Sequence, residues 1–266
     1  MNEGLGLTAL AGLCWLTAAT PAAAADDAFC ADRPGLATPP CTLAAGRTAV
    51  EIGLADWTLD RQKETRTDTV VAGDTLLRFG LSPILEAQLG WTAYGRVRTR
   101  DRLVGGVTRM SGIGDVRLSV RRSLSGSGGP VAIQPFVTLP TGGSAIGAGD
   151  WGAGVLLPAQ FDLAPSVQLG LTPEIDAAVD ADGSGRHLAF SGVAGLSASV
   201  APKLDLTGEV AAMRDDDPAR STTSLLASLS LAYYSTANSQ FDVGLVAGLN
   251  RTAPDVELYV GIARRF

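Results

Sequence analysis

The sequence predicts an all-β protein: an antiparallel transmembrane β-barrel of about 12 strands, preceded by a signal peptide. Hydrophobic residues make up 46% of the 266 residues, but beyond the N-terminus no segment has the run of about 18 apolar residues that marks a membrane helix. Apolar and polar residues instead alternate along successive segments. This period of two indicates strands with one apolar and one polar face.

The alternation is clearest in the final segment, 255–266. Val256, Leu258, Val260 and Ile262 share one face, and Phe266 ends the chain. This segment resembles the C-terminal strand of bacterial outer-membrane β-barrels. The resemblance implies that similar strands fill the chain and occur in even number.

Residues 1–25 are expected to be a signal peptide. An apolar run, 5–16, is followed by small residues, with cleavage expected after Ala25. Glu3 stands where a basic residue is usual, and an uncleaved anchor is the alternative. Leu13 before Cys14 argues against a lipoprotein.

Residues 26–47 are expected to form a periplasmic N-terminal segment, because its three prolines break regular structure. A second possibility is that this segment folds into the barrel as a plug. Cys30 and Cys41 lie close together in an exported segment, so a disulfide is expected. Two free thiols are the alternative.

The barrel is expected to occupy residues 48–266. Segment 59–66 is a charged loop, segment 95–112 is a long basic loop, and segment 140–149 is a glycine-rich loop. The expected strands are 48–57, 69–81, 84–94, 113–123, 131–139, 150–162, 167–179, 187–200, 204–213, 222–234, 240–250 and 255–266.

Loop lengths and aromatic positions favour a membrane barrel over a soluble one. Longer, more polar connections tend to alternate with short turns, and aromatic residues fall at strand ends, as in the girdles of outer-membrane barrels. Trp57 is off the parity of its strand and requires a bulge or a position at the rim. A soluble antiparallel barrel or sandwich would show the same alternation, but with the apolar face packed inward.

Charge limits the partners. The whole chain has a net charge of −6. Removal of residues 1–25 deletes Glu3 and leaves 21 − 26 = −5, which argues against nucleic acid. The expected partners are outer-membrane lipid and lipopolysaccharide, together with a small-molecule solute. No cofactor is expected.

Three segments carry a family resemblance: 73–91 (GDTLLRFGLSPILEAQLGW), 111–124 (SGIGDVRLSVRRSL) and 136–142 (FVTLPTG). They resemble the outer-membrane transporter family named for the meta-pathway of phenol degradation. The resemblance implies a barrel of the Gram-negative outer membrane that passes small, often aromatic or hydrophobic, compounds. The family supplies no catalytic motif to carry over.

Strand parity directs a set of polar side chains into the lumen, where they could line a mixed-charge path for a solute. A filled interior of ion pairs is the alternative for a barrel of this size. The expected lumen-lining residues are Arg78, Glu86, Gln88, Asp115, Arg117, Arg121, Glu174, Asp176 and Glu257. Inward parity also holds for Glu51, Asp74, Asp205, Glu209, Asp242 and Arg265.

The function expected is passage of small molecules through an outer-membrane channel, without catalytic residues. A lipid hydrolase and a structural or adhesion barrel are the alternatives. The single histidine, His187, is interpreted as a rim residue, although a hydrolase would need a histidine beside a serine. No metal site is assigned: segment 180–191 begins like a calcium loop but has Ser191 where a glutamate is required. The acidic tip 215–217 could meet divalent ions at the lipopolysaccharide surface.

Overall fold

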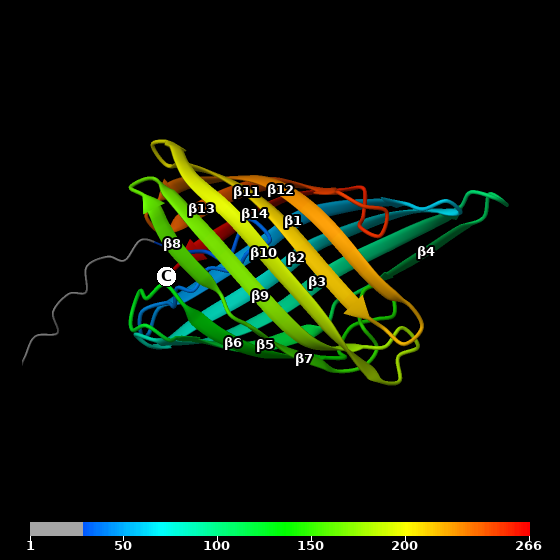
Figure 1. Cartoon of the computed structure of the whole chain (residues 1–266), viewed down its shortest axis with the longest axis horizontal. Coiled ribbons are helices and arrows are strands. Elements are labelled where there is room, and N and C mark those ends of the chain that lie inside the picture. Colours follow the sequence, from blue (N-terminus) through cyan, green and yellow to red (C-terminus); the bar gives the residue numbers. More distant parts are fainter. Residues whose placement is uncertain (1–28) are drawn as a thin grey trace, which may run out of the picture.

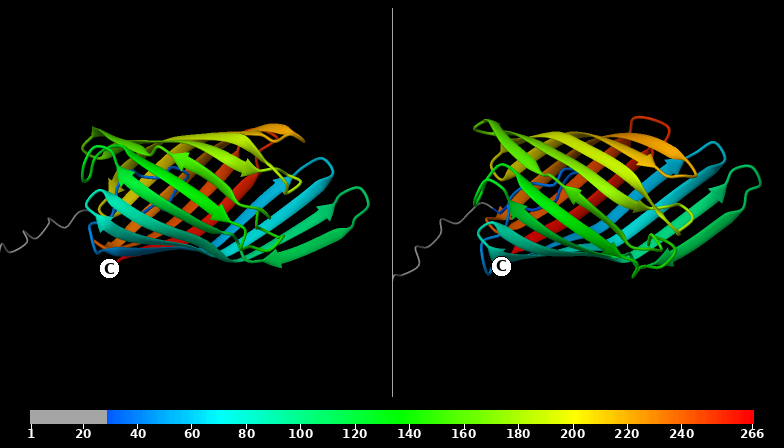
Figure 2. Two further views of the ribbon diagram at one scale, coloured as in Figure 1. Left: turned by 90° about the horizontal axis from the view of Figure 1, so that it is seen from below. Right: turned by 60° about the horizontal axis from the view of Figure 1, so that its bottom comes forward.

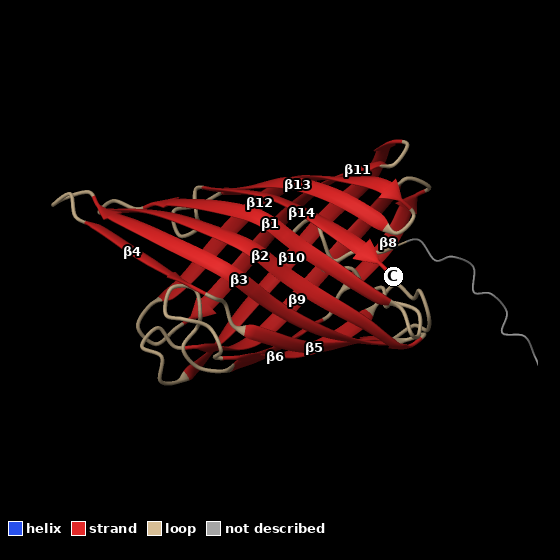
Figure 3. Cartoon of the chain, turned by 180° about the vertical axis from the view of Figure 1, so that it is seen from behind, coloured by secondary structure: helices blue, strands red, loops and turns tan. Residues whose placement is uncertain are grey.

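The chain folds into one closed antiparallel β-barrel in a computed structural model that describes residues 29–266 (Figure 1). The expected signal peptide, 1–25, lies outside the described residues. All regular structure within 29–266 is β-strand (Figure 3). Over the described residues, no helix has the length and apolar character needed to span a membrane.

The bounds of the strands are β1 Thr48–Arg61, β2 Thr65–Ser82, β3 Leu85–Asp101, β4 Val107–Gly112, β5 Val116–Ser123, β6 Ala132–Leu139, β7 Gly152–Leu156, β8 Ala159–Ala164, β9 Val167–Val179, β10 Arg186–Ala201, β11 Leu204–Asp216, β12 Ser221–Thr236, β13 Ser239–Gly248 and β14 Val256–Arg265.

The ring is closed by the pairing of β1 with β14, and neighbours in sequence pair around the rest of the wall. β4 and β5 both pair with β3, and β7 and β8 both pair with β9. Each of these two pairs therefore occupies one strand position in the wall, with an interruption between its members. The 14 strands thus fill 14 − 2 = 12 positions around the barrel. The expected count of about 12 is confirmed.

Several expected boundaries differ from the structure. The expected loop 59–66 is reduced to 62–64, because β1 continues to Arg61 and β2 begins at Thr65. The expected loop 95–112 is mostly strand, because β3 continues to Asp101 and forms a hairpin with β4. This hairpin extends beyond the neighbouring strands (Figure 2), where arginines can point to either face without meeting lipid. The expected strand 150–162 is interrupted at Leu157–Pro158, since proline has no N–H to donate to a ladder.

The wall is apolar outside and polar inside. Outward positions of several strands carry exposed large hydrophobics, among them Leu118, Leu229, Val243 and Leu258. Fully buried side chains include Arg78, Arg121, Glu51 and Glu86. A soluble barrel would have the opposite arrangement, and an apolar band facing outward is what a bilayer requires.

Trp57 owes its outward position to a β-bulge. The register between β1 and β14 shifts between Gly53 and Ala55, which reverses the parity of the residues that follow. Trp57 then lies opposite Leu258 and Val70, both exposed on the outer surface. Of the two explanations for its parity, a bulge or a rim position, the bulge is confirmed.

The end of the barrel where β1 begins and β14 ends carries tight turns at 83–84, 165–166, 202–203 and 237–238. Outer-membrane barrels have short periplasmic turns and both termini in the periplasm, so this is the periplasmic end. A girdle of aromatic side chains, each at least 41% exposed, lies near it: Phe79, Phe161, Tyr233, Phe241 and Phe266.

Candidate functional site in the lumen

Residues 29–47 lie inside the periplasmic end of the barrel, and we name them the lumen segment. They do not form the lead-in outside the barrel that their prolines suggested. The segment has no strand or helix before Thr48, so its backbone needs partners elsewhere. The wall supplies them through buried polar side chains. Of the two possibilities raised by the sequence, the structure shows the plug.

Arg78 of β2 is the first anchor of the lumen segment. Its side chain has no exposed surface. Its Nη1 donates to the carbonyl oxygen of Cys30 at 2.7 Å and to Glu51 Oε1 at 2.9 Å. Its Nε donates to Glu86 Oε1 at 2.8 Å. A guanidinium removed from water in this way needs carboxylate and carbonyl partners, since an unpaired buried charge is very costly.

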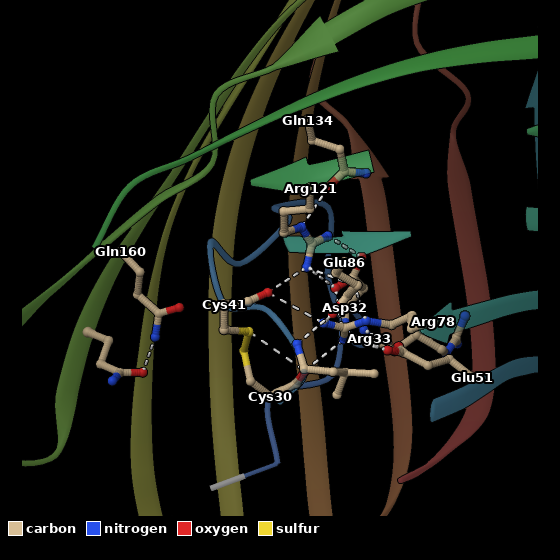
Figure 4. The surroundings of a disulfide bond; sticks show 12 residues. Cys30, Asp32, Arg33, Cys41, Glu51, Arg78, Glu86, Arg121, Gln134 and Gln160 are labelled. Carbon is tan, nitrogen blue, oxygen red and sulfur yellow. Dashed lines mark hydrogen bonds and ion pairs between the residues drawn. A yellow bond between two sulfur atoms is a disulfide. The ribbon is translucent and has the colours of Figure 1, made fainter. Parts of the chain in front are cut away.

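Arg121 of β5 is the second anchor (Figure 4). Its two terminal nitrogens contact the two carboxylate oxygens of Asp32 at 2.8 and 2.5 Å, which is the bidentate geometry that arginine favours. Its Nη1 also donates to the Cys41 carbonyl oxygen at 3.0 Å, and its Nε donates to Gln134 Oε1 at 2.6 Å. Burial would raise the pKa of Asp32, but the guanidinium groups of Arg121 and Arg78 outweigh burial and hold that pKa below its usual value.

The opposite wall holds the segment with carboxylates. Glu209 of β11 accepts hydrogen bonds from the backbone N–H groups of Leu36 and Ala37, at 2.7 and 2.8 Å. Asp242 of β13 pairs with Arg33 at 2.9 Å. Inward parity placed both carboxylates in the lumen, but no sequence signal showed that they bind residues 29–47.

Two glycines of the wall leave room for this docking. A Cβ on Gly80 would lie 2.1 Å from the carbonyl oxygen of Ala44, and a Cβ on Gly261 would lie 2.4 Å from Arg33 Nε. Any side chain there would overlap the lumen segment. The wall and the segment are therefore shaped to each other as well as complementary in charge.

The expected disulfide between Cys30 and Cys41 is present. It closes the loop whose two ends offer carbonyl oxygens to Arg78 and Arg121. Figure 4 shows the disulfide with the two guanidinium groups that the cysteine carbonyl oxygens contact. The crosslink thus fixes the spacing of the two carbonyl groups that the anchors bind.

The structure separates the predicted lumen residues into groups. Arg78, Glu86, Gln88 and Arg121 form one buried network, in which Gln88 donates to Glu86 at 2.7 Å. Farther along the barrel, Arg117 pairs with Glu174 at 3.6 Å. Asp176 belongs to this second group, because its carboxylate interacts with both Glu174 and Arg117. Two predicted residues lie outside both groups: Asp115 accepts from the backbone of Gly142 and Ala148, and Glu257 lies opposite Thr58.

Arg117 lies flat against an aromatic ring. Its guanidinium carbon is 3.4 Å from the centroid of Phe136 on β6, a stacked cation–π arrangement. Phe136 was not among the predicted site residues. Its inward parity on β6 was the signal that could have identified it, because a large aromatic side chain in a polar lumen is unusual.

The lumen segment leaves two cavities beside it. The larger, about 750 Å³, lies against β8 to β13 and reaches the periplasmic turns; Thr38, Gln168, Glu209 and Tyr234 contribute to its lining. The smaller, about 290 Å³, is lined by residues that include Asp32, Gln88, Arg117 and Glu174. Asp32 and Thr38 border both cavities, so the segment is the partition between them.

His187 lies at the external end of β10, as the rim interpretation expected. The charged groups that contact its ring within the described residues are all carboxylates. Serine, which a hydrolase would need beside it, is not among these contacts.

These features define the class of the protein: an outer-membrane β-barrel with a polar lumen partly filled by residues 29–47. The sequence model of a family described as "Putative MetA-pathway of phenol degradation" matches residues 31–266. The chain belongs to this family. The resemblance carried by segments 73–91, 111–124 and 136–142 is confirmed.

Two solved structures share the fold with TM-scores above 0.5, and a third matches with a lower score. An outer membrane channel from Pseudomonas putida F1 is 15% identical, with a TM-score of 0.68 over 85% of this chain and 98% of that one. The β domain of the Bordetella autotransporter BrkA is 13% identical, with a TM-score of 0.55 over 84% of this chain and all (100%) of that one. The CymD monoaromatic hydrocarbon channel is 9% identical, with a TM-score of 0.47 over 84% and 88%. No curated protein sequence matches this chain.

Proposed function

We propose that this outer-membrane barrel conducts small molecules passively and favours compounds with an aromatic or hydrophobic part. The observation that carries the proposal is the pair of cavities on either side of the lumen segment, with Arg117 stacked on Phe136 beside the smaller one. Pockets of a few hundred Å³ suit small ligands. The family description, which refers to phenol degradation, supports the same class of solute.

The path runs past the lumen segment. A solute entering from outside first meets Arg117, Glu174 and Phe136, where a flat ring could replace one partner of the stacked guanidinium. It then passes the partition at Asp32 and Thr38 and reaches the larger cavity at the periplasmic turns. Passage requires part of the segment to shift, since the two cavities are separated by it.

Two other functions have less support. The ring of His187 contacts carboxylates, an arrangement without the nucleophile that a lipid hydrolase needs. An adhesion barrel would have no use for polar cavities beside a docked segment.

The test is solute flux into liposomes that contain the refolded chain 26–266. Two solutes of equal size, one aromatic and one aliphatic and polar, are compared. We expect faster entry of the aromatic solute. Phe136→Leu keeps an apolar side chain but removes the ring, and should lower that preference while leaving the polar solute unchanged.

Leu103→Ala, at the tip of the β3–β4 hairpin, is the matched control and should retain the preference. Absence of flux from a barrel that migrates as folded in unheated gels would refute conduction by this chain. Equal flux of both solutes in the parent protein would refute the aromatic preference while leaving conduction intact.

A further inference from the structure

The external ends of β9, β10 and β11 bring four polar side chains together on the lumen face. Asp180 follows β9, His187 is the second residue of β10, Asp215 is near the end of β11, and Asp217 follows it. Cross-strand pairing places the inward positions of these strands side by side. We name these four residues the rim cluster.

Two carboxylates of the rim cluster converge on a single nitrogen. His187 Nδ1 is 2.9 Å from Asp180 Oδ1 and 3.7 Å from Asp217 Oδ2. One ligand atom from each of these three residues lies within 4.8 Å of the other two. An imidazole nitrogen carries one proton or one lone pair, so it can donate a hydrogen bond to only one of the two carboxylates. A cation between the three atoms would contact both.

The spacing suits a metal ion with short bonds. Zinc binds histidine nitrogen and carboxylate oxygen at about 2.0–2.2 Å in a tetrahedral arrangement, so its ligand atoms are about 3.3–3.6 Å apart. The two distances from Nδ1 bracket that range. A mixed nitrogen and oxygen set favours a transition metal of this kind, because calcium and magnesium prefer oxygen ligands alone.

The imidazole of His187 is largely shielded, and its second nitrogen faces a carboxylate. The side chain of His187 is 6% exposed, and among the described residues Nε2 is one of the few buried polar atoms without a hydrogen-bond partner. Asp215 Oδ1 lies 2.9 Å from it. A metal on Nδ1 would leave the proton on Nε2, facing a carboxylate, which is the usual outer partner of a metal-bound histidine.

The backbone fixes Asp217 in place. Its Oδ2 accepts from the N–H of Ala181 at 2.6 Å, and its Oδ1 accepts from the N–H of Ala219 at 2.7 Å. On the other side of the site, a Cβ on Gly185 would lie 2.1 Å from Asp180 Oδ2, so a side chain there would displace this carboxylate. Two separate loops therefore present their carboxylates to one imidazole.

We propose that Asp180, His187 and Asp217 bind one divalent transition-metal ion of the zinc class at the external mouth of the lumen, with Asp215 orienting the imidazole. The ion would join the loop 180–185 to the loop 217–220 and leave a fourth coordination position open to water or a solute. The proposal does not depend on which solute the barrel conducts.

The test is metal binding by the refolded chain 26–266 in detergent free of lipopolysaccharide, after removal of all metal. Zinc binding is measured by calorimetry. Cobalt, used as a spectroscopic substitute, should give the visible absorption bands of a four-coordinate site. We expect one zinc per chain. His187→Gln and Asp217→Asn should each weaken zinc binding at least tenfold, and Asp215→Asn should weaken it about 10-fold or more, as outer partners do.

Two neighbouring acids serve as controls, and both should bind zinc like the parent. Asp182 contacts Ser184, and Asp216 pairs with Arg214, so Asp182→Asn and Asp216→Asn leave the three ligands intact. Folding of each variant is checked by its mobility in unheated gels. Failure of the folded parent to bind zinc, or unchanged zinc binding in the His187 variant, would overturn the proposal. Full competition by calcium at equal concentration would overturn the assignment to the zinc class.

Discussion

The carboxylate of Asp32 and the guanidinium of Arg121 meet through two contacts, although 89 residues separate them in the chain. One belongs to the irregular N-terminal residues and the other to the barrel wall. The pair thus converts an open polar ring into a lumen with a partition. Under the proposed function, the strength of this docking sets how readily a solute passes the partition.

Loss of Arg121 should release this part of the lumen segment. Arg121→Gln removes the buried charge that pairs with Asp32, and breaking a buried pair by removing one partner costs about 3–5 kcal/mol. We expect increased ion conductance in planar bilayers and faster proteolysis within 29–44, with the barrel still folded. Arg109→Gln, on the exposed β4 hairpin strand, is the control and should change neither. Unchanged conductance in Arg121→Gln would contradict the anchoring role.

Lowering the pH should raise the conductance in the same way as Arg121→Gln. The pKa of Asp32 is lowered in the folded protein by Arg121 and Arg78, so its contribution to docking is present above the unfolded value of about 3.9 and is lost as the pH falls through the folded value. Glu51 of β1 faces the same group of charges. We expect conductance to rise reversibly below about pH 4.

Asp32→Asn should remove most of this pH dependence, because the variant lacks the titrating carboxylate and should conduct at the higher level at neutral pH. A conductance that falls in acid, or an identical acid response in the variant, would show that another group controls the segment.

Reduction of the disulfide should loosen the lumen segment without unfolding the barrel. The sequence has three cysteines, and removal of 1–25 leaves only Cys30 and Cys41. A crosslink that closes a loop of about 15 residues contributes about 3 kcal/mol by limiting the free chain. We expect a reductant to raise conductance and expose two thiols to a maleimide reagent. The Cys30→Ser, Cys41→Ser double variant should show the raised conductance, and the reductant should not change that conductance.

The sequence predicted the strands of the barrel wall better than it predicted the docking of the lumen segment inside the barrel. Period-two alternation placed Arg78, Glu86 and Arg121 inward, and the off-parity Trp57 correctly required a bulge, because strand parity is a local property. The lumen segment has no periodicity. Its partners, such as Glu209, lie far along the chain, so its docking depends on the closed ring. The extended β3–β4 hairpin was missed because strand length beyond the bilayer is not set by lipid. Phe136 was missed although its inward parity on β6 was a local signal.

A single arginine substitution can test whether the outer face of the barrel contacts lipid. Leu229 lies near the middle of β12, between Gly208 and Leu245, and is 52% exposed. Leu229→Arg should lower the free energy of unfolding in lipid vesicles by about 2–4 kcal/mol, the cost of arginine near the bilayer midplane. Leu103→Arg, 73% exposed at the hairpin tip, should have almost no effect. Equal effects in urea titrations would contradict the placement of the bilayer.

The seam between β1 and β14 has a consequence for how this molecule could assemble. Contacts of residues 29–47 with β1, β2, β3 and β5 use strands that come early in the chain, whereas the Arg33–Asp242 contact requires β13. The ring shuts only when β14 reaches β1. Residues already bound to the early strands are then enclosed, with no need to thread through a finished wall. The N-terminal residues would therefore act as an internal template around which the nascent sheet curves.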